Sequence, residues 1–382
     1  MIDTQQAAHG QTFADALAQI DEWIRPAGVQ GAGAAVWHHG TIVAERYAGD
    51  ARPGVATNAE TLFPLASVTK PISAAAVMTL VDRGFVSLDE PVAPHLPEFV
   101  ADPAAPATDP ALEALRPTIT LRQLLAHTSG LPEDLGPRHL RYADKPDLDA
   151  LIDAMCRLPL QSAPGAQLRY SNAGFAVLTR LAERLAAEPF WDLARRDVLD
   201  PLGLADVVAQ PDPSEEERIA TLADTLHPGT DVETYNSPYW RDLALPWGGL
   251  YGTPRDLARF AGSFLPSGAA LGSLSLPTRA EMIEDQAGGV PGGVECGKVH
   301  WEVAHWGLGW EVKGTKRRHW TGNLTSPATF CHFGQAGTLL WGDPERDLAL
   351  AVFANRAVTR VWSFFLARWV RLSDALVAAA DV

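Results

Sequence analysis

Two side chains with complementary chemistry lie three residues apart where a polar loop runs into an apolar segment. Ser67 and Lys70 fall within residues 62–81 (LFPLASVTKPISAAAVMTLV), and Pro71 indicates that a helix starts close to them. Because three residues make nearly one helical turn, the hydroxyl and the amine project from one face. The N–H groups at a helix start also favour a negative charge. The pattern is typical of a serine nucleophile beside a proton acceptor, although an N-capping serine and a solvated lysine would give the same spacing.

A second polar group precedes another apolar helix. Tyr170-Ser171-Asn172 stands at the start of a helix predicted for residues 173–187. A phenol near a lysine ammonium is able to carry a proton, since the cation favours the phenolate, and the amide of Asn172 is able to donate to a substrate carbonyl. A half-buried aromatic ring and a helix N-cap are the structural alternatives for Tyr170 and Asn172.

The third candidate lies on a predicted strand near the C-terminus. His332-Phe333-Gly334 falls in residues 331–341 (CHFGQAGTLLW), and Gly334 would let a ligand approach the backbone closely. An isolated strand histidine is more often structural, so His332 is a candidate only together with the other two motifs.

In chain order, Ser67-Val68-Thr69-Lys70, Tyr170-Ser171-Asn172 and His332-Phe333-Gly334 resemble the S-x-x-K, Y-x-N and K/H-x-G motifs of the serine β-lactamase-like superfamily. That superfamily includes class C β-lactamases, family VIII carboxylesterases and D-stereospecific peptidases. Three further segments are similar to it, so the likeness covers most of the chain: residues 121–132, 246–260 and 337–356. Membership alone does not fix the substrate.

The resemblance implies a catalytic role for four residues. Ser67 would be the nucleophile that accepts the acyl group, and Lys70 and Tyr170 would share the work of general base and general acid. Which of the two is the primary base stays open. The backbone N–H groups of Ser67 and Gln335 would form the oxyanion hole.

By the same resemblance, Asn172 and His332 would orient the substrate, and Gly334 would let it approach the strand. Many members carry lysine where this chain has His332, and a lysine supplies a fixed charge for a substrate carboxylate. Histidine is mostly neutral near pH 7, which favours neutral esters or amides. Lys313-Gly314-Thr315 has the letters of a third motif in the wrong order and is not taken as one.

These motifs need elements that bring distant parts of the chain together. Strand patterns occur near both ends and helical patterns dominate the middle. The predicted strands cover residues 32–38, 41–49, 307–312, 329–333, 338–341 and 348–354. The predicted helices cover residues 13–24, 71–83, 121–126, 148–156, 173–187, 191–198 and 361–372.

We therefore expect an α/β (α+β) fold of the serine β-lactamase-like kind, in which helices flank an antiparallel sheet and a mainly helical region is inserted. The sheet region would comprise residues 1–66 and 245–382, and the helical region residues 67–244. The active site would lie at their junction.

Composition excludes several classes of protein. The chain has 382 residues with 47% hydrophobic side chains, enough for a large core. Its 46 acidic and 31 basic residues give a net charge of −15, which argues against nucleic acid as a partner. The basic cluster at residues 313–318 is predicted to be a solvated hairpin tip. Core positions are the default for the tryptophans at 240, 247, 306, 310 and 320.

Cysteine spacing and the N-terminal sequence favour the cytoplasm. Cys156, Cys296 and Cys331 are far apart in sequence, which favours a reducing compartment. The N-terminus has no basic start, apolar signal run or cleavage site. No window reaches the roughly 18 consecutive apolar residues of a membrane span. We expect a cytoplasmic protein with no membrane contact, and its oligomeric state stays open.

No metal-binding or cofactor-binding pattern accompanies the three motifs. H-E-x-x-H, paired C-x-x-C and G-x-S-x-G do not occur in the sequence. Gly31 and Gly33 open a strand instead of following one, which argues against a dinucleotide site. The sequence therefore predicts no metal and no cofactor.

The predicted reaction is hydrolysis of a small-molecule carboxylic ester through a covalent acyl-enzyme on Ser67. The alternatives are a D-stereospecific peptidase or amidase, a weak class C-type β-lactamase, an acyltransferase and a non-catalytic sensor that is acylated without turnover. The motifs do not determine acyl-chain length, stereochemistry or the choice between ester, amide and β-lactam.

Overall fold

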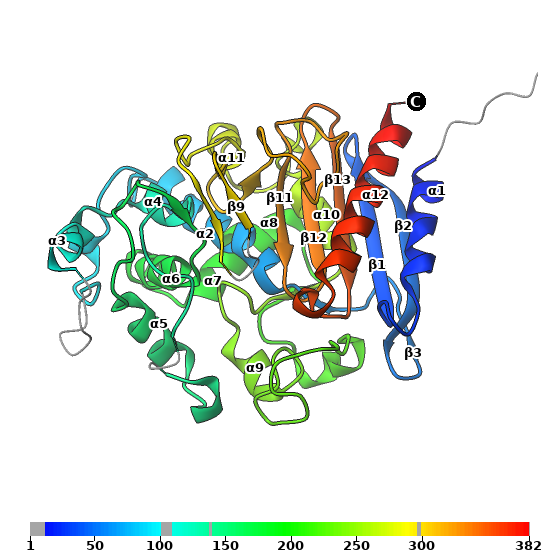
Figure 1. Cartoon of the computed structure of the whole chain (residues 1–382), viewed down its shortest axis with the longest axis horizontal. Coiled ribbons are helices and arrows are strands. Elements are labelled where there is room, and N and C mark those ends of the chain that lie inside the picture. Colours follow the sequence, from blue (N-terminus) through cyan, green and yellow to red (C-terminus); the bar gives the residue numbers. More distant parts are fainter. Residues whose placement is uncertain (1–11, 101–108, 137–139, 296–298, 382) are drawn as a thin grey trace, which may run out of the picture.

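A seven-stranded antiparallel sheet forms the centre of the computed structural model, which describes residues 12–100, 109–136, 140–295 and 299–381 (Figure 1). The strand order is β10-β11-β12-β13-β1-β2-β3, so both ends of the chain contribute neighbouring strands. The central pair joins β1 to β13, with Ala32 opposite Ala354. The strands are β1 Gly31–His38, β2 Thr41–Arg52, β3 Val55–Ala56, β10 Glu311–Val312, β11 Phe330–Gly334, β12 Thr338–Asp343 and β13 Leu348–Ala354.

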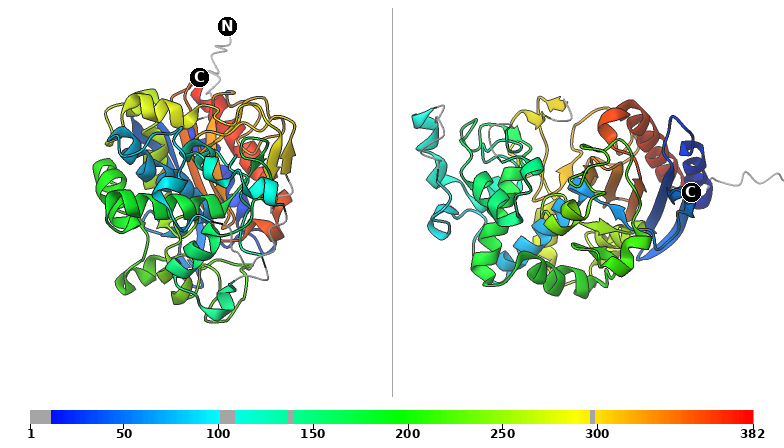
Figure 2. Two further views of the ribbon diagram at one scale, coloured as in Figure 1. Left: turned by 90° about the vertical axis from the view of Figure 1, so that its left-hand side faces the viewer. Right: turned by 90° about the horizontal axis from the view of Figure 1, so that it is seen from below.

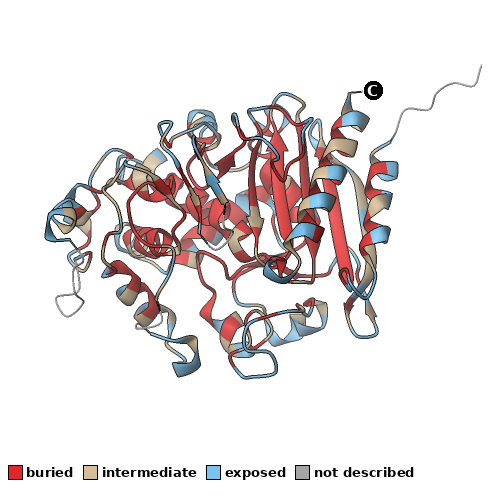
Figure 3. Cartoon of the chain, viewed as in Figure 1, coloured by how far each residue is buried: buried red, intermediate tan, exposed pale blue. Residues whose placement is uncertain are grey.

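Helices cover both faces of this sheet, which confirms the predicted fold class. Leu350 and Val352 of β13 pack with α12 (Trp362–Ala380) and α1 (Phe13–Leu17). The alternate residues, such as Phe353, pack on the opposite face, where α10 (Pro254–Gly262) contacts β1 and β13. Because both faces are covered, every residue of β13 (LALAVFA) is apolar and buried instead of alternating with polar residues, and Figure 3 shows the burial of the central strands.

Most helices of the middle of the chain gather beside the sheet, as the view from below in Figure 2 also shows. Helix α2 is nearly enclosed, with every residue from Thr69 to Leu80 buried. These helices are α2 Thr69–Asp82, α3 Pro110–Glu113, α4 Leu121–Leu125, α5 Leu148–Cys156, α6 Asn172–Ala186, α7 Phe190–Ala194, α8 Asp200–Leu202, α9 Pro238–Leu243 and α11 Leu276–Ile283.

Two small sheets link these helices to the rest of the chain. The strand order is β4-β7-β6 in one and β5-β8-β9 in the other. Their strands are β4 Phe63–Pro64, β5 Leu168–Arg169, β6 Val207–Val208, β7 Tyr251–Gly252, β8 Gly292–Val294 and β9 Val299–Trp301. Since β5 pairs with β8, the C-terminal part of the chain also adds strands to the helical side. The division at residues 66/67 and 244/245 stays a prediction.

The basic cluster at residues 313–318 is not a solvated tip, and that prediction was wrong. Lys313 and Lys316 are buried, and only Arg317 and Arg318 have exposed charges. The Lys313 ammonium donates to the carbonyl of Thr325 at 2.6 Å, and Lys316 forms an ion pair inside the protein. Composition alone does not show that a lysine has buried partners.

Two further expectations can be compared with the described residues. Cys156 and Cys331 are free and buried, whereas Cys296 lies outside the described residues. None of the helices in the described part of the chain combines the length and apolar character that crossing a membrane requires.

Candidate active site

Ser67 lies in a short 3-10 turn, η2 (Ala66–Val68), immediately before α2. The preceding residue, Ala66, has a φ of +48°, a left-handed conformation that is uncommon outside glycine and that clusters at functional sites. Lys70 is fully buried in the first turn of α2. Its ammonium lies 3.4 Å from the Ser67 hydroxyl and donates to the carbonyl of Trp247 at 2.6 Å. The predicted proximity of hydroxyl and amine is therefore present.

Tyr170 is brought to the same lysine from the segment between β5 and α6. The Lys70 ammonium lies 4.8 Å from the centroid of the Tyr170 ring. Ser171, not Asn172, is the N-cap of α6, because its hydroxyl accepts from the N–H of Gly174. The Asn172 side chain is therefore available for another partner, and its amide donates to the Asp134 carboxylate at 3.0 Å.

Gly334 allows strand β11 to lie directly against the turn that carries Ser67. A Cβ atom at Gly334 would come within 2.3 Å of the Leu65 carbonyl oxygen, so any other residue would force the strand away. This close approach places Gln335, the next residue, beside Ser67 in the lining of one cavity.

His332 presents a neutral, accepting nitrogen to that cavity. Its Nδ1 lies 2.8 Å from the Phe333 carbonyl oxygen, which only accepts, so Nδ1 carries the proton. Nε2 therefore has a lone pair, and it is buried with no hydrogen-bond partner among the described residues. Burial, followed by the nearby Lys70 charge, lowers the pKa of His332 to about 3.

The candidate residues meet around one cavity of about 730 Å³, a size typical of small-molecule sites. Ser67, Tyr170, Asn172, His332 and Gln335 line it. The wall also includes buried tryptophans that were predicted as core residues, and these are Trp240, Trp247 and Trp306. The site thus joins three distant segments, and the catalytic roles of its residues stay predictions.

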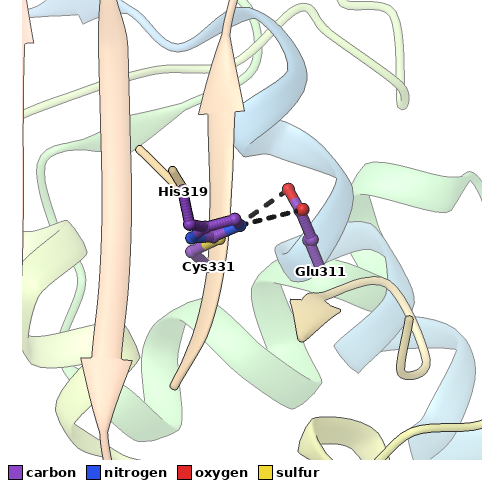
Figure 4. A group of neighbouring side chains, drawn as sticks. All are labelled: Glu311, His319 and Cys331. Carbon is purple, nitrogen blue, oxygen red and sulfur yellow. Dashed lines mark hydrogen bonds and ion pairs between the residues drawn. The ribbon is translucent and has the colours of Figure 1, made fainter. Parts of the chain in front are cut away.

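Glu311 also lines this cavity, and its side chain belongs to a buried group that includes His319 and Cys331 (Figure 4). His319 and Cys331 are its neighbours, and one ligand atom from each of the three lies within 4.8 Å of the others. The Glu311 carboxylate accepts from Lys316 at 2.7 Å and from His319 at 3.0 Å. Burial raises the pKa of Glu311, but Lys316 and His319 outweigh it, and the net pKa is lowered.

Glutamate, histidine and cysteine are all possible zinc ligands, but their contacts favour an ion-pair network over a metal centre. The Lys316 ammonium lies 2.7 Å from the same Glu311 Oε1 atom that His319 contacts, and its charge would repel a cation. Burial and the Glu311 charge also raise the pKa of Cys331 well above its usual range, which favours a thiol over the thiolate that binds metals.

Comparison with known proteins identifies the family. A family model described as Beta-lactamase matches residues 14–369. The chain belongs to the beta-lactamase family. This membership agrees with the three motifs gathered around the cavity.

Individual relatives of this beta-lactamase-family chain differ in name. It is 34% identical over 221 residues to "Penicillin-binding protein 4" of Amycolatopsis lactamdurans, covering 57% of this chain and 54% of that one. It is 36% identical over 211 residues to "Esterase EstB" of Burkholderia gladioli, covering 51% and 52%. The matched segment thus spans about half the length of these curated relatives. A solved family VIII carboxylesterase has the same fold, with a TM-score of 0.76, 22% identity and 95% coverage of both chains.

One residue of this beta-lactamase-family site, His127, was not singled out from the sequence. Its Nδ1 accepts from the N–H of Ser171 at 3.0 Å, and its ring lies 4.5 Å from that of Tyr170. His127 is fully buried in a left-handed conformation with a φ of +57°, and burial, together with Lys70, lowers its pKa well below the usual value. The segment LRQLLAHTSGLP carried the superfamily likeness, but nothing in it indicated that this histidine supports the Tyr170 turn.

Replacing His127 is expected to affect the turnover number more than substrate affinity. His127→Leu removes the acceptor for Ser171 and should lower kcat by about 10²-fold, the cost of a misplaced catalytic group. His127→Asn keeps an acceptor near the Nδ1 position and tolerates the left-handed backbone, so its kcat should stay within about fivefold of wild type. Steady-state kinetics on an ester, with thermal unfolding of each variant, would measure both. Equal losses in the two variants, or a change confined to KM, would contradict a positioning role.

Proposed function

We propose that this protein is a serine hydrolase, and specifically a carboxylesterase that works through an acyl-enzyme on Ser67. The Ser67 Oγ attacks the ester carbonyl carbon, and its proton passes to the coupled pair of Lys70 and Tyr170. The carbonyl oxygen becomes an oxyanion, which the backbone N–H groups of Ser67 and Gln335 stabilise. When the intermediate collapses, the C–O bond to the alcohol breaks and the pair returns the proton to the leaving oxygen.

The second half of the reaction repeats these steps with water. The pair removes a proton from water, the hydroxide adds to the acyl carbon, and the bond to Ser67 breaks. The proton returns to Oγ and the carboxylic acid leaves, so the enzyme is restored. The contact of Lys70 with Ser67 at 3.4 Å and with the Tyr170 ring supports this sharing of the proton.

The neutral, accepting face of His332 carries the choice of a neutral ester. A substrate carboxylate near Nε2 would meet a lone pair instead of a hydrogen-bond donor. Because Nε2 and the carboxylate oxygen both only accept, no hydrogen bond would form between them. β-Lactams and the C-terminal ends of peptides carry such a carboxylate, whereas a simple ester does not. The similarity to an esterase of Burkholderia gladioli is in line with this choice. Because the chain is also similar to a penicillin-binding protein, peptidase activity is the second candidate function.

A panel of three chromogenic substrates would test the proposal. p-Nitrophenyl butyrate, a chromogenic cephalosporin and a D-alanine p-nitroanilide should be compared by kcat/KM at equal enzyme concentration. We expect the ester to exceed each of the others by at least about tenfold. A higher value for the anilide would identify a D-peptidase, a higher value for the cephalosporin a β-lactamase, and a single burst without turnover an acylated sensor.

Ester hydrolysis is expected to show no ionisation of His332 between about pH 5 and pH 9. Because its pKa is lowered to about 3, the imidazole stays neutral throughout this range. His332→Gln keeps an accepting oxygen near the Nε2 position and has no titrating group. The profiles of kcat/KM against pH for wild type and this variant should therefore have the same shape. A step near pH 6 that only the wild type shows would contradict the neutral assignment.

A further inference from the structure

Asp134 is a carboxylate at the substrate cavity, and the hydrogen-bond donors that it meets among the described residues are uncharged. It lines the cavity together with Asn172, and the residue is exposed to solvent. The N–H of Leu135 donates to one oxygen at 2.7 Å and the Asn172 amide to the other at 3.0 Å. A carboxylate has about four acceptor positions, so room remains for further donors. Among the described residues, no ion pair involves Asp134.

A second acceptor without a donor lies beside this carboxylate. Because the Asn172 Nδ2 group faces Asp134, its Oδ1 atom points elsewhere, and Oδ1 is buried with no hydrogen-bond partner among the described residues. Asn172 itself lines the cavity. Two adjacent acceptors, one of them charged, suit a ligand group that has several N–H donors and a positive charge.

Aromatic rings line the cavity near the same carboxylate. The ring centroids of Tyr142 and Trp240 are 4.9 Å apart, and those of Tyr235 and Trp240 are 5.5 Å apart. Tyr142 and Asp134 line the same cavity, and burial, followed by the charge of Asp134, raises the pKa of Tyr142. Aromatic faces attract cations, most strongly in desolvated sites.

The other charges of the cavity wall leave this end negative. Two of the other acidic side chains already face cations, since Asp224 pairs with Arg356 at 2.6 Å and Glu311 with Lys316 at 2.7 Å. Arg360 also lines the cavity, but it belongs to the turn whose Val358 N–H donates to the Gln335 carbonyl, on the side of β11. Negative charge at the Asn172 side and positive charge at the Gln335 side would orient a charged substrate.

We propose that the cavity contains an ammonium subsite, in which Asp134 and Asn172 accept hydrogen bonds from a protonated amine that packs against the rings of Tyr142 and Trp240. The substrate is then an ester that carries a primary amine. This inference rests on the proposed function in one respect, that the amine belongs to the ester being cleaved.

Binding to a variant that cannot react would test the subsite without turnover. Two probes of nearly equal size are methyl 6-aminohexanoate, which ends in an ammonium group, and methyl heptanoate, which ends in a methyl group. Calorimetry with Ser67→Ala should show that the ammonium probe binds at least about tenfold more tightly than the neutral one. Adding Asp134→Asn should reduce this ratio to about one.

Arg360→Gln in the same Ser67→Ala background is the matched control, because it removes a charge from the opposite side of the cavity. In this double variant, the affinity for the ammonium probe relative to the neutral probe should stay at or above the ratio for Ser67→Ala alone. A ratio near one in Ser67→Ala, or a high ratio that survives Asp134→Asn, would overturn the subsite.

Hydrolysis of the same two esters by the unmutated enzyme separates this inference from the proposed function. A higher kcat/KM for the amino ester than for the neutral ester supports both the ammonium subsite and the proposed esterase activity. Turnover of both esters at equal rates would keep the esterase and remove the subsite. Tight, Asp134-dependent binding of the ammonium probe without cleavage of either ester would keep the subsite and remove the esterase.

Discussion

Replacing Ser67 with alanine is expected to lower kcat/KM for p-nitrophenyl butyrate by at least about 10⁴-fold. The hydroxyl supplies the atom that bonds to the acyl group, and removal of a serine nucleophile costs this much or more in well-studied hydrolases. Lys70→Met should cause a similar loss, because it removes the ammonium that lies 3.4 Å from Oγ. Combining the two changes should add little, since residues that act as a unit are not additive.

Ser73→Ala is the control for this prediction. Ser73 lies on the same helix, but its hydroxyl donates to the Pro246 carbonyl and is absent from the cavity lining. The kcat/KM of Ser73→Ala should remain within about threefold of wild type.

A fluorophosphonate should add one adduct, which peptide mapping should find on Ser67 and which Ser67→Ala should lack. Full activity in Ser67→Ala, or an adduct on another serine, would exclude the assigned nucleophile.

Glu311→Gln is expected to reduce the free energy of unfolding by about 3–5 kcal/mol. The change leaves the fully buried Lys316 ammonium without its counter-charge, and removal of one partner from a buried pair costs this much. The double variant Glu311→Gln, Lys316→Met should recover at least half of the loss, because it removes the unpaired charge as well. Denaturant unfolding followed by tryptophan fluorescence would measure each value.

Glu302→Gln, which changes an exposed residue of the same segment, should alter the free energy of unfolding by less than about 0.5 kcal/mol.

The Glu311 network should also make the stability of the fold sensitive to acid. The folded-state pKa values of Glu311 and His319 are both lowered, so their contribution is present at neutral pH. It should decline as the pH falls below 6.5, the ordinary pKa of histidine, and further below 4.5, that of glutamate. Equal stability at pH 7 and pH 5 would contradict this view of the network.

The sequence predicted the architecture where patterns were local and strong. Strand β13 and helix α5 occupy the residues expected from their apolar patterns. The N-terminal helix was expected over residues 13–24 but is divided into α1 and a 3-10 turn over Ala18–Trp23, and α12 continues to Ala380, beyond its predicted end. Such differences arise because tertiary packing, not intrinsic propensity, sets where helices end.

For the site, the motifs predicted which residues meet but not how they are held. Sequence spacing alone predicted that Lys70 lies beside Ser67. It did not predict that the Lys70 ammonium donates to the carbonyl of Trp247, which is 177 positions away in the sequence. Nor did spacing show that His127 holds the Tyr170 turn or that Asp134 faces Asn172. The tautomer of His332 depends on a backbone carbonyl, which every residue carries, so no sequence pattern distinguishes it. Long-range partners of this kind become visible only when the chain is folded.

The pairing of β1 with β13 has a consequence for synthesis on the ribosome. Ala32 is translated roughly 300 residues before its partner Ala354, an interval of about 15–60 s at about 5–20 residues per second. During that time β1 has only β2 as a neighbour, and its other edge is open to association with other nascent chains. The cavity that Ser67 lines also needs β11, so a chain truncated before residue 330 would lack His332 and Gln335 and would keep an unpaired strand edge that favours aggregation.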